Sequence, residues 1–281
     1  MVLGGDGPEM AFLHANAYPP ECYRLLVKAF SRDFHIRAMS LRPLWKDSSA
    51  TSIHSWHALS ADFLAWQGRW SSGPILAVGH SLGAIVALRA ALQEPASFRG
   101  LVLLDPVLLM PGRILAWRVM RHFPAGHGLH PVIRRAERRR CVFRDMDEVF
   151  AAYRRYPIFR RLADDHLKVV IQGLVQSVDG HVQLRYSPAW EARIYSTAIW
   201  NDLDLWRGLP TLSVPTLIIR GAESETLTEV ACEAARRANG RVQVETVEQT
   251  THLVPLERPL EVYRLAYDFL QHSLEARQIG E

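Results

Sequence analysis

The stretch "PILAVGHSLGAIVALRAAL", from Pro74 to Leu92, changes from an apolar run into a helical pattern at a serine that stands between two glycines. A nucleophilic serine must present its hydroxyl beyond the carboxyl end of a strand, on a turn so tight that its backbone is strained. Gly79 and Gly83 have no side chains to collide with the strand and helix of such a turn. The stretch therefore predicts a reactive Ser81 on a strand–turn–helix unit.

The helix that follows the serine is expected to direct its first amides at the same point. Leu82 N–H is then placed to donate a hydrogen bond to a developing oxyanion. The alternative is a chance Gly-x-Ser-x-Gly pattern in a glycine-rich loop, but the strand-like run before it and the helical run after it favour the nucleophile. His80, inside the motif, is expected to point away from the hydroxyl and to have a structural role.

Strand-like runs alternate with helical patterns on both sides of this unit. Continuous apolar runs of this kind suit a parallel sheet that is covered by helices on both faces, and the alternation implies right-handed βαβ units. The predicted fold class is α/β, with a mostly parallel central sheet flanked by helices. Strands are expected at residues 10–15, 34–41, 74–79, 99–109, 215–221 and 241–248, and helices at 21–30, 56–66, 82–93, 227–238 and 259–276.

The alternation stops between about Pro106 and Pro210. We therefore expect a core formed by residues 1–105 and 211–281, interrupted by a helical insertion at 106–210. The insertion has 17 Lys and Arg against 10 Asp and Glu, in a chain of net charge +4. Its arginine-rich runs have two interpretations. They could form a positively charged entrance for an acidic substrate, or they could be solvated helix faces whose arginine side chains cover apolar surface with their aliphatic parts. The second interpretation is favoured.

A serine hydroxyl needs a base to accept its proton, usually a histidine that a carboxylate orients. His252 lies in "VEQTTHLVPLERP", after a predicted strand and before the last helix, which places it at the carboxyl edge of the sheet beside Ser81. The acid should follow a strand between the two. We expect Glu225, after "TLIIRG", with Asp105 at the end of "LVLLD" as the alternative acid, while Glu223 is read as a cap of the next helix.

These segments resemble the α/β-hydrolase superfamily, and the resemblance covers nearly the whole chain. "GHSLGA" is similar to its nucleophile elbow, and "THLVPLERPLEVYRLAYDFL" to its histidine loop and final helix, often written GH-x-x-x-x-E-x-P. "FLHANAYPP" is similar to the His-Gly segment that supplies a second oxyanion donor. Three departures are visible: Ala15 stands where glycine is usual, Glu225 where aspartate is usual, and the N-terminal hairpin must be shortened or absent, which leaves a sheet edge to protect.

The resemblance implies an α/β-hydrolase fold in which residues 106–210 form the cap. It also implies a catalytic triad and an oxyanion hole, with Ala15 as the alternative to Asn16 as second donor. The implied site residues are Ser81, His252 and Glu225 for the triad, and the amides of Leu82 and Asn16 for the oxyanion hole.

A serine nucleophile argues against the epoxide hydrolases and haloalkane dehalogenases of this superfamily, which use an aspartate there. The expected activity is therefore that of a carboxylesterase-like serine hydrolase, which cleaves a carboxylic ester or related acyl substrate through an acyl-enzyme intermediate. The same triad also serves thioesterases and C–C bond hydrolases. The rival class is a non-catalytic ligand-binding protein, because a fold alone does not confer activity.

Composition excludes several other classes of protein. An apolar content of 48% is enough for a large core, the first residues lack the pattern of a signal peptide, and no apolar run reaches the roughly 20 residues that span a bilayer. Cys22, Cys141 and Cys232 show neither a disulfide framework nor a zinc spacing. We expect a cytoplasmic protein that takes a small-molecule acyl substrate without metal or cofactor and binds no nucleic acid. The sequence says little about its oligomeric state.

Overall fold

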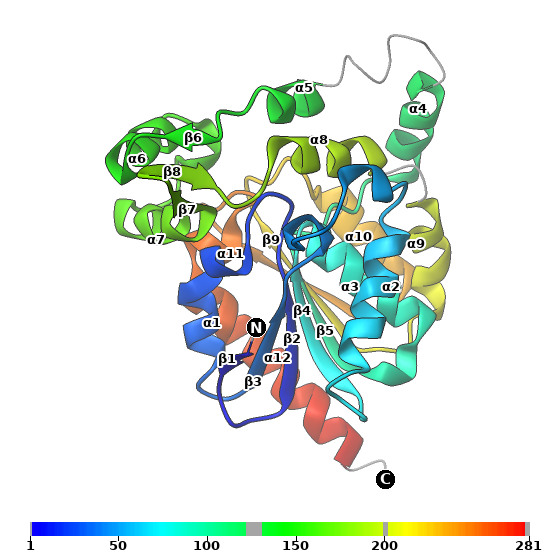
Figure 1. The fold of residues 1–281 in the computed structure, drawn as a ribbon. Coiled ribbons are helices and arrows are strands. Elements are labelled where there is room, and N and C mark those ends of the chain that lie inside the picture. Colours follow the sequence, from blue (N-terminus) through cyan, green and yellow to red (C-terminus); the bar gives the residue numbers. More distant parts are fainter. Residues whose placement is uncertain (1, 122–130, 199–201, 279–281) are drawn as a thin grey trace.

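The computed structural model describes residues 2–121, 131–198 and 202–278. Within these residues seven strands form one sheet in the order β1-β3-β2-β4-β5-β9-β10, and all but β1 run parallel (Figure 1). The predicted α/β class, a mostly parallel sheet flanked by helices, is thus confirmed. The strands are β1 (Val2–Gly4), β2 (Glu9–Leu13), β3 (His35–Met39), β4 (Ile75–His80), β5 (Phe98–Leu104), β9 (Thr216–Gly221) and β10 (Val242–Val247).

Alternate side chains of the central strands enter two separate cores. On β2, Ala11 and Leu13 belong to one buried cluster, whereas Met10 and Phe12 belong to the other. This is the period of two that a strand imposes on its side chains. Because both faces are covered, the strands read as continuous apolar runs rather than as alternating ones.

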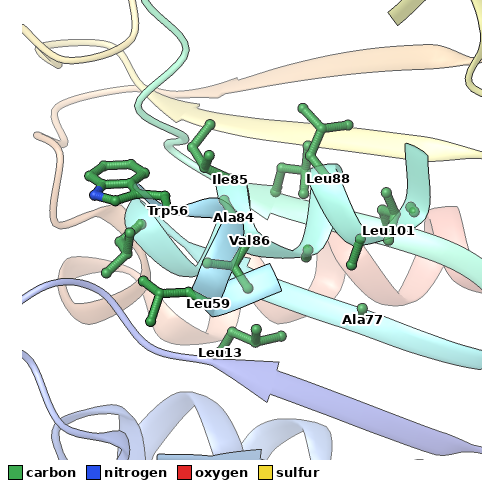
Figure 2. Packing of buried hydrophobic residues seen from close by; sticks show 14 of the residues in the cluster. Leu13, Trp56, Leu59, Ala77, Ala84, Ile85, Val86, Leu88 and Leu101 are labelled. Carbon is green, nitrogen blue, oxygen red and sulfur yellow. The ribbon is translucent and has the colours of Figure 1, made fainter. Parts of the chain in front are cut away.

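Helices cover the two faces of the sheet. Helices α1 (Arg24–Phe30) and α12 (Pro259–Gln278) supply one core, and α2 (His57–Gln67), α3 (Leu82–Gln93) and α10 (Glu229–Ala238) supply the other. Figure 2 shows the second core, in which Leu59 of α2 and Ile85 of α3 lie with Leu13, Ala77 and Leu101 from the strands. The helix that follows Ser81 is therefore fixed against the middle of the sheet.

Strand β1 lies at the edge of the sheet beside β3. It has three residues and pairs antiparallel with β3. This short strand covers the edge of β3, which would otherwise present unpaired backbone groups to solvent.

Most of the segment between β5 and β9 lies above the carboxyl ends of the strands, whereas its last helix, α9 (Leu203–Gly208), packs beside α3 (Figure 1). The segment contains the expected helices and also a three-stranded antiparallel sheet in the order β6-β8-β7, which the sequence reading missed because its strands are only two to four residues long. The elements before α9 are α4 (Pro111–Arg121), α5 (Pro131–Glu137), β6 (Val142–Phe143), α6 (Met146–Arg154), α7 (Asp164–Leu174), β7 (Val175–Val178), β8 (His181–Leu184) and α8 (Pro188–Thr197).

No helix in the described part of the chain combines the length and the hydropathy that crossing a bilayer requires. The cytoplasmic location inferred from the sequence stays a prediction.

His14, directly after β2, is a fully buried histidine held in one tautomer. Its Nδ1 lies 2.8 Å from the carbonyl oxygen of Ala15, and its Nε2 lies 3.0 Å from the amide nitrogen of Leu41. A carbonyl can only accept, so Nδ1 carries the proton and Nε2 accepts the Leu41 N–H. Burial lowers the pKa of His14 to about 4, which keeps the ring neutral at physiological pH.

This burial predicts a loss of stability in acid. The unfolded chain binds a proton at His14 below pH 6.5, whereas the folded chain does so only below about pH 4. Folding must therefore expel that proton between these pH values, and the contribution of His14 falls by about 3 kcal/mol across the window, at about 1.4 kcal/mol per pKa unit.

Urea denaturation of the wild type and of His14→Gln between pH 8 and pH 4 tests this expectation. The difference between their free energies of unfolding should be constant above pH 6.5 and should shift in favour of the variant below it. Parallel curves over the whole range would contradict the assignment.

Candidate active site

Ser81 forms the turn between β4 and α3. Its φ angle is +54°, in a region that costs a residue other than glycine on the order of 1–3 kcal/mol. The turn is held by the N–H of Ser81, which donates to Leu104 O at 2.9 Å, and by Ser81 O, which accepts the N–H of Ile85 at 3.3 Å. The serine is thus presented at the carboxyl end of a central parallel strand.

The two glycines around Ser81 are required by different neighbours. A Cβ on Gly79 would lie 2.4 Å from the carbonyl oxygen of Gly83, at the start of α3. A Cβ on Gly83 would lie 2.3 Å from the carbonyl oxygen of Leu13, on the neighbouring strand β2. The first glycine therefore lets the turn close on itself, and the second lets α3 approach the sheet.

His252 lies between Ser81 and a carboxylate. Its Nε2 is 2.9 Å from Ser81 Oγ, and its Nδ1 is 2.7 Å from Asp105 Oδ1. In a neutral ring bonded to an ionised carboxylate, Nδ1 carries the proton, which leaves Nε2 free to accept the hydrogen of the serine hydroxyl. This arrangement can move a proton from the serine to the imidazole while the carboxylate fixes the tautomer of the ring.

Asp105 ends β5 with a φ angle of +41° and no solvent exposure. Besides His252, its carboxylate accepts a hydrogen bond from Ser224 Oγ at 2.6 Å and from Gly221 N–H at 2.8 Å. Ser224 Oγ in turn accepts two backbone N–H groups of its own loop, both at 3.2 Å. Each oxygen of the buried carboxylate therefore has a partner, and its orientation toward His252 is fixed.

The expected acid, Glu225, is not brought to His252 and is corrected to the alternative, Asp105. The Glu225 side chain is exposed, and Glu223, expected to cap the next helix, pairs instead with Arg160 and Arg161. The loop after β9 does reach Asp105, but through the hydroxyl of Ser224, while the side chain of the next residue, Glu225, lies in solvent. The available signal was that Asp105 directly ends an apolar strand, where a carboxylate is buried and needs partners.

The loop that carries His252 crosses back over the sheet. Strand β10 lies three positions from β4, which is about 14 Å at the usual strand spacing. A Cβ on Gly221, at the end of β9, would lie 2.1 Å from the carbonyl oxygen of Thr251, so the loop runs directly over that strand. Buried Glu257, a residue not singled out from the sequence, accepts hydrogen bonds from Thr251 N–H at 2.7 Å and Thr251 Oγ1 at 2.6 Å. It corresponds to the glutamate of the GH-x-x-x-x-E-x-P pattern.

Backbone amides near Ser81 come from two elements. Leu82 N–H is the first amide of α3 and has no acceptor within the helix. Ala15 N–H is engaged, because it donates to Tyr23 Oη at 3.2 Å. The carbonyl of Ala15 is held by His14, and in a trans peptide the following N–H points the opposite way. This geometry favours Asn16 over Ala15 as the second donor.

The side chain of Asn16 faces the segment above the sheet. Its Oδ1 accepts a hydrogen bond from Tyr186 Oη at 2.8 Å, and its Nδ2 donates to the carbonyl oxygen of Glu191 at 3.3 Å. Both partners belong to the segment between β5 and β9. That segment is therefore tied directly to the loop that follows β2.

The arginine run at residues 134–144 divides between solvent and protein. Arg139 is largely buried, with Nη1 2.6 Å from Glu191 Oε2 and Nη2 2.5 Å from Tyr153 Oη. The other arginines of the run, at positions 134, 135, 138, 140 and 144, are exposed. Most of the run thus forms a solvated face, as favoured from the sequence, while one guanidinium is paired beside the Asn16 contact.

Neither the cysteines nor other ligand side chains form a metal cluster in residues 2–121, 131–198 and 202–278. Burial raises the pKa of Cys232 to about 12, so this thiol stays protonated at neutral pH.

A strained serine between a parallel strand and a helix, bonded to a histidine and a buried aspartate, defines a class of α/β enzymes, and comparisons with known proteins agree with it. A model of the alpha/beta hydrolase family matches residues 10–265. The chain belongs to that family. Hydrolysis is accordingly the class of reaction that its relatives support.

Three proteins of known structure or name are similar to the chain. Lipase LipV of Mycobacterium tuberculosis is 24% identical over 194 residues, which cover 68% of this chain and 66% of that protein, just under two thirds of its length. The E-2-(acetamidomethylene)succinate hydrolase, whose crystal structure is known, has 22% sequence identity to this chain. The TM-score between the two structures is 0.79, over 95% of this chain and 93% of that one. The esterase Rv0045c of M. tuberculosis is 19% identical, with a TM-score of 0.70 over 94% and 84% of the two chains.

The close packing around Gly83 predicts that alanine at this position destabilises the protein, whereas alanine at an open glycine position does not. In Gly83→Ala the new Cβ would meet Leu13 O, so either the strand or the helix has to shift. We expect the free energy of unfolding to fall by about 1–3 kcal/mol, the usual cost of overpacking. The matched control is Gly240→Ala, where nothing lies within 4 Å of the added Cβ. Chemical denaturation of both variants is the measurement, and equal stabilities would contradict the packing described.

Proposed function

We propose that this protein is a serine hydrolase that cleaves a carboxylic ester or related acyl substrate through an acyl-enzyme intermediate. Ser81 is the nucleophile, His252 the general base and Asp105 the acid that orients it. The amides of Leu82 and Asn16 form the oxyanion hole. The proposal rests on the hydrogen-bonded series from Ser81 Oγ to His252, at 2.9 Å, and from His252 to Asp105, at 2.7 Å.

In the proposed reaction, Ser81 Oγ attacks the substrate carbonyl carbon while its proton passes to His252 Nε2. Asp105 stabilises the resulting imidazolium, and the two amides donate to the oxyanion of the tetrahedral intermediate. His252 then gives the proton to the leaving group, and the bond between carbonyl carbon and leaving group breaks. A water molecule, deprotonated by His252, then attacks the carbonyl carbon of the acyl-enzyme. The bond between that carbon and Ser81 Oγ breaks, His252 returns the proton to Ser81 Oγ, and the carboxylic acid is released.

Residues 106–210 are proposed to act as a cap that bounds the acyl site. Support comes from Tyr186 and Glu191, which belong to this segment and hydrogen-bond the side chain of Asn16. A group bound between the segment and the sheet would therefore lie beside the proposed oxyanion hole. The names of the lipase and esterase relatives favour an ester as the bond that is cleaved.

The nucleophile is tested with a fluorophosphonate probe, which phosphonylates an activated serine. Wild-type protein should be labelled, with the added mass on the peptide that contains Ser81, and Ser81→Ala should not be labelled. Ser97→Ala, at a partly buried position beyond the far end of α3, should behave like wild type. A wild-type protein that stays unlabelled, while an esterase standard is labelled in the same tube, would refute the proposal.

The acid is tested by comparing two carboxylates in p-nitrophenyl acetate hydrolysis. Asp105→Asn presents an amide to His252, disfavours the required tautomer and should lower kcat by about 10³- to 10⁴-fold. Glu225→Gln removes an exposed charge away from the imidazole, so kcat should remain within about twofold. A large loss in Glu225→Gln with an active Asp105→Asn would reverse the assignment.

A further inference from the structure

Two buried side chains with no role in the proposed reaction link the loops that carry its proposed groups. Tyr23, at the end of the short helix η1 (Pro20–Tyr23), and His80, at the end of β4, have no solvent exposure. Tyr23 Oη lies 3.2 Å from Ala15 N and 2.7 Å from His80 Nδ1. His80 Nε2 lies 2.8 Å from the main-chain carbonyl oxygen of His252.

The direction of each hydrogen bond follows from the chemistry of its ends. The carbonyl of His252 can only accept, so His80 carries its proton on Nε2. In the neutral ring Nδ1 then accepts the hydroxyl hydrogen of Tyr23, and the Tyr23 oxygen accepts the N–H of Ala15. Burial, with a contribution from His252, holds the pKa of His80 well below its ordinary value, which preserves this neutral form.

The series joins three loops, two of which follow the neighbouring strands β2 and β4, while the third follows the distant strand β10. Ala15 precedes the proposed donor Asn16 after β2, His80 precedes Ser81 after β4, and His252 follows β10. Strands β4 and β10 are separated by β5 and β9, so the sheet alone does not set the distance between Ser81 and the backbone of His252. The hydrogen bond from His80 to the His252 carbonyl sets it directly.

We propose that Tyr23 and His80 are positioning residues for the hydrolysis, an inference that rests on the function proposed above. They fix the positions of the Asn16 amide, the Ser81 hydroxyl and the His252 ring relative to one another. The same arrangement then serves both proton transfer and oxyanion stabilisation. Displacing reacting groups by about 1 Å can cost about 100-fold in rate, so a hydroxyl remote from the substrate can affect kcat. A merely structural hydroxyl would affect the stability of the protein and leave kcat per active site unchanged.

The test is Tyr23→Phe, which removes only the hydroxyl. We expect kcat, normalised by active-site titration, to fall about 10- to 100-fold while KM changes less than about threefold. The rate of fluorophosphonate labelling at Ser81 should fall in parallel. The matched control is Tyr263→Phe, which removes a tyrosine hydroxyl bonded to Asp33. That variant should keep the wild-type kcat whatever its melting temperature.

A second variant, His80→Gln, keeps an N–H donor for the His252 carbonyl. It should lower kcat without a matching change in KM. Combining it with Tyr23→Phe should cost less than the product of the two single losses, because the residues act as one unit. If Tyr23→Phe does not fold, the kcat and KM of His80→Gln decide the question.

The outcomes separate this inference from the proposed function. An unlabelled and inactive wild type refutes the serine hydrolase and the positioning role together. A labelled, active wild type with an unchanged kcat in both Tyr23→Phe and His80→Gln overturns the positioning role alone. A reduced kcat with an equally reduced value in Tyr263→Phe also overturns it, because the effect would then be general destabilisation.

Discussion

The constraint on which the site depends is the reach of one imidazole ring across the sheet. His252 follows β10 at the edge, yet its nitrogens must meet Ser81 at the end of β4 and Asp105 at the end of β5. The loop can make this crossing because Gly221 has no side chain where the Thr251 carbonyl passes over β9. Glu257 then holds the loop from one side and His80 from the other. Gly221, Glu257 and His80 thus all serve one requirement, that the His252 loop crosses β9 and stays in place there.

Backbone strain is present at both strand ends that the His252 ring must reach. Ser81 and Asp105 both have positive φ angles, and they end neighbouring strands. Such conformations persist only where the surroundings determine them, and here a buried core on each face of the sheet holds both strands. Ser81 and Asp105 of the candidate site are therefore mounted on strands that are packed on both faces of the sheet.

The sequence predicts much of this arrangement because its signals are local. Glycine spacing around Ser81 requires only the adjoining strand and helix, and the alternation of apolar runs gives the α/β class. The choice between Asp105 and Glu225 is different, because it depends on how far the His252 loop travels over the sheet, which no local pattern encodes. Ser224 and Tyr23 are hidden for the same reason, since their hydroxyls find partners more than 50 residues away. The small sheet β6-β8-β7 has strands too short for a period of two to be recognised.

The residues proposed to act on the substrate all stand outside residues 106–210, and that segment begins directly after Asp105. Its sequence can consequently diverge between descendants of a common ancestor while the proton path is inherited unchanged. On the proposed function, a lineage could adapt to a new substrate by changes in this region. Asn16 marks where that independence ends, because its side chain is bonded to Tyr186 and Glu191. A substitution of Tyr186 would be inherited together with compensating changes in the loop after β2, whereas residue 191 contributes its main-chain carbonyl, which any residue supplies.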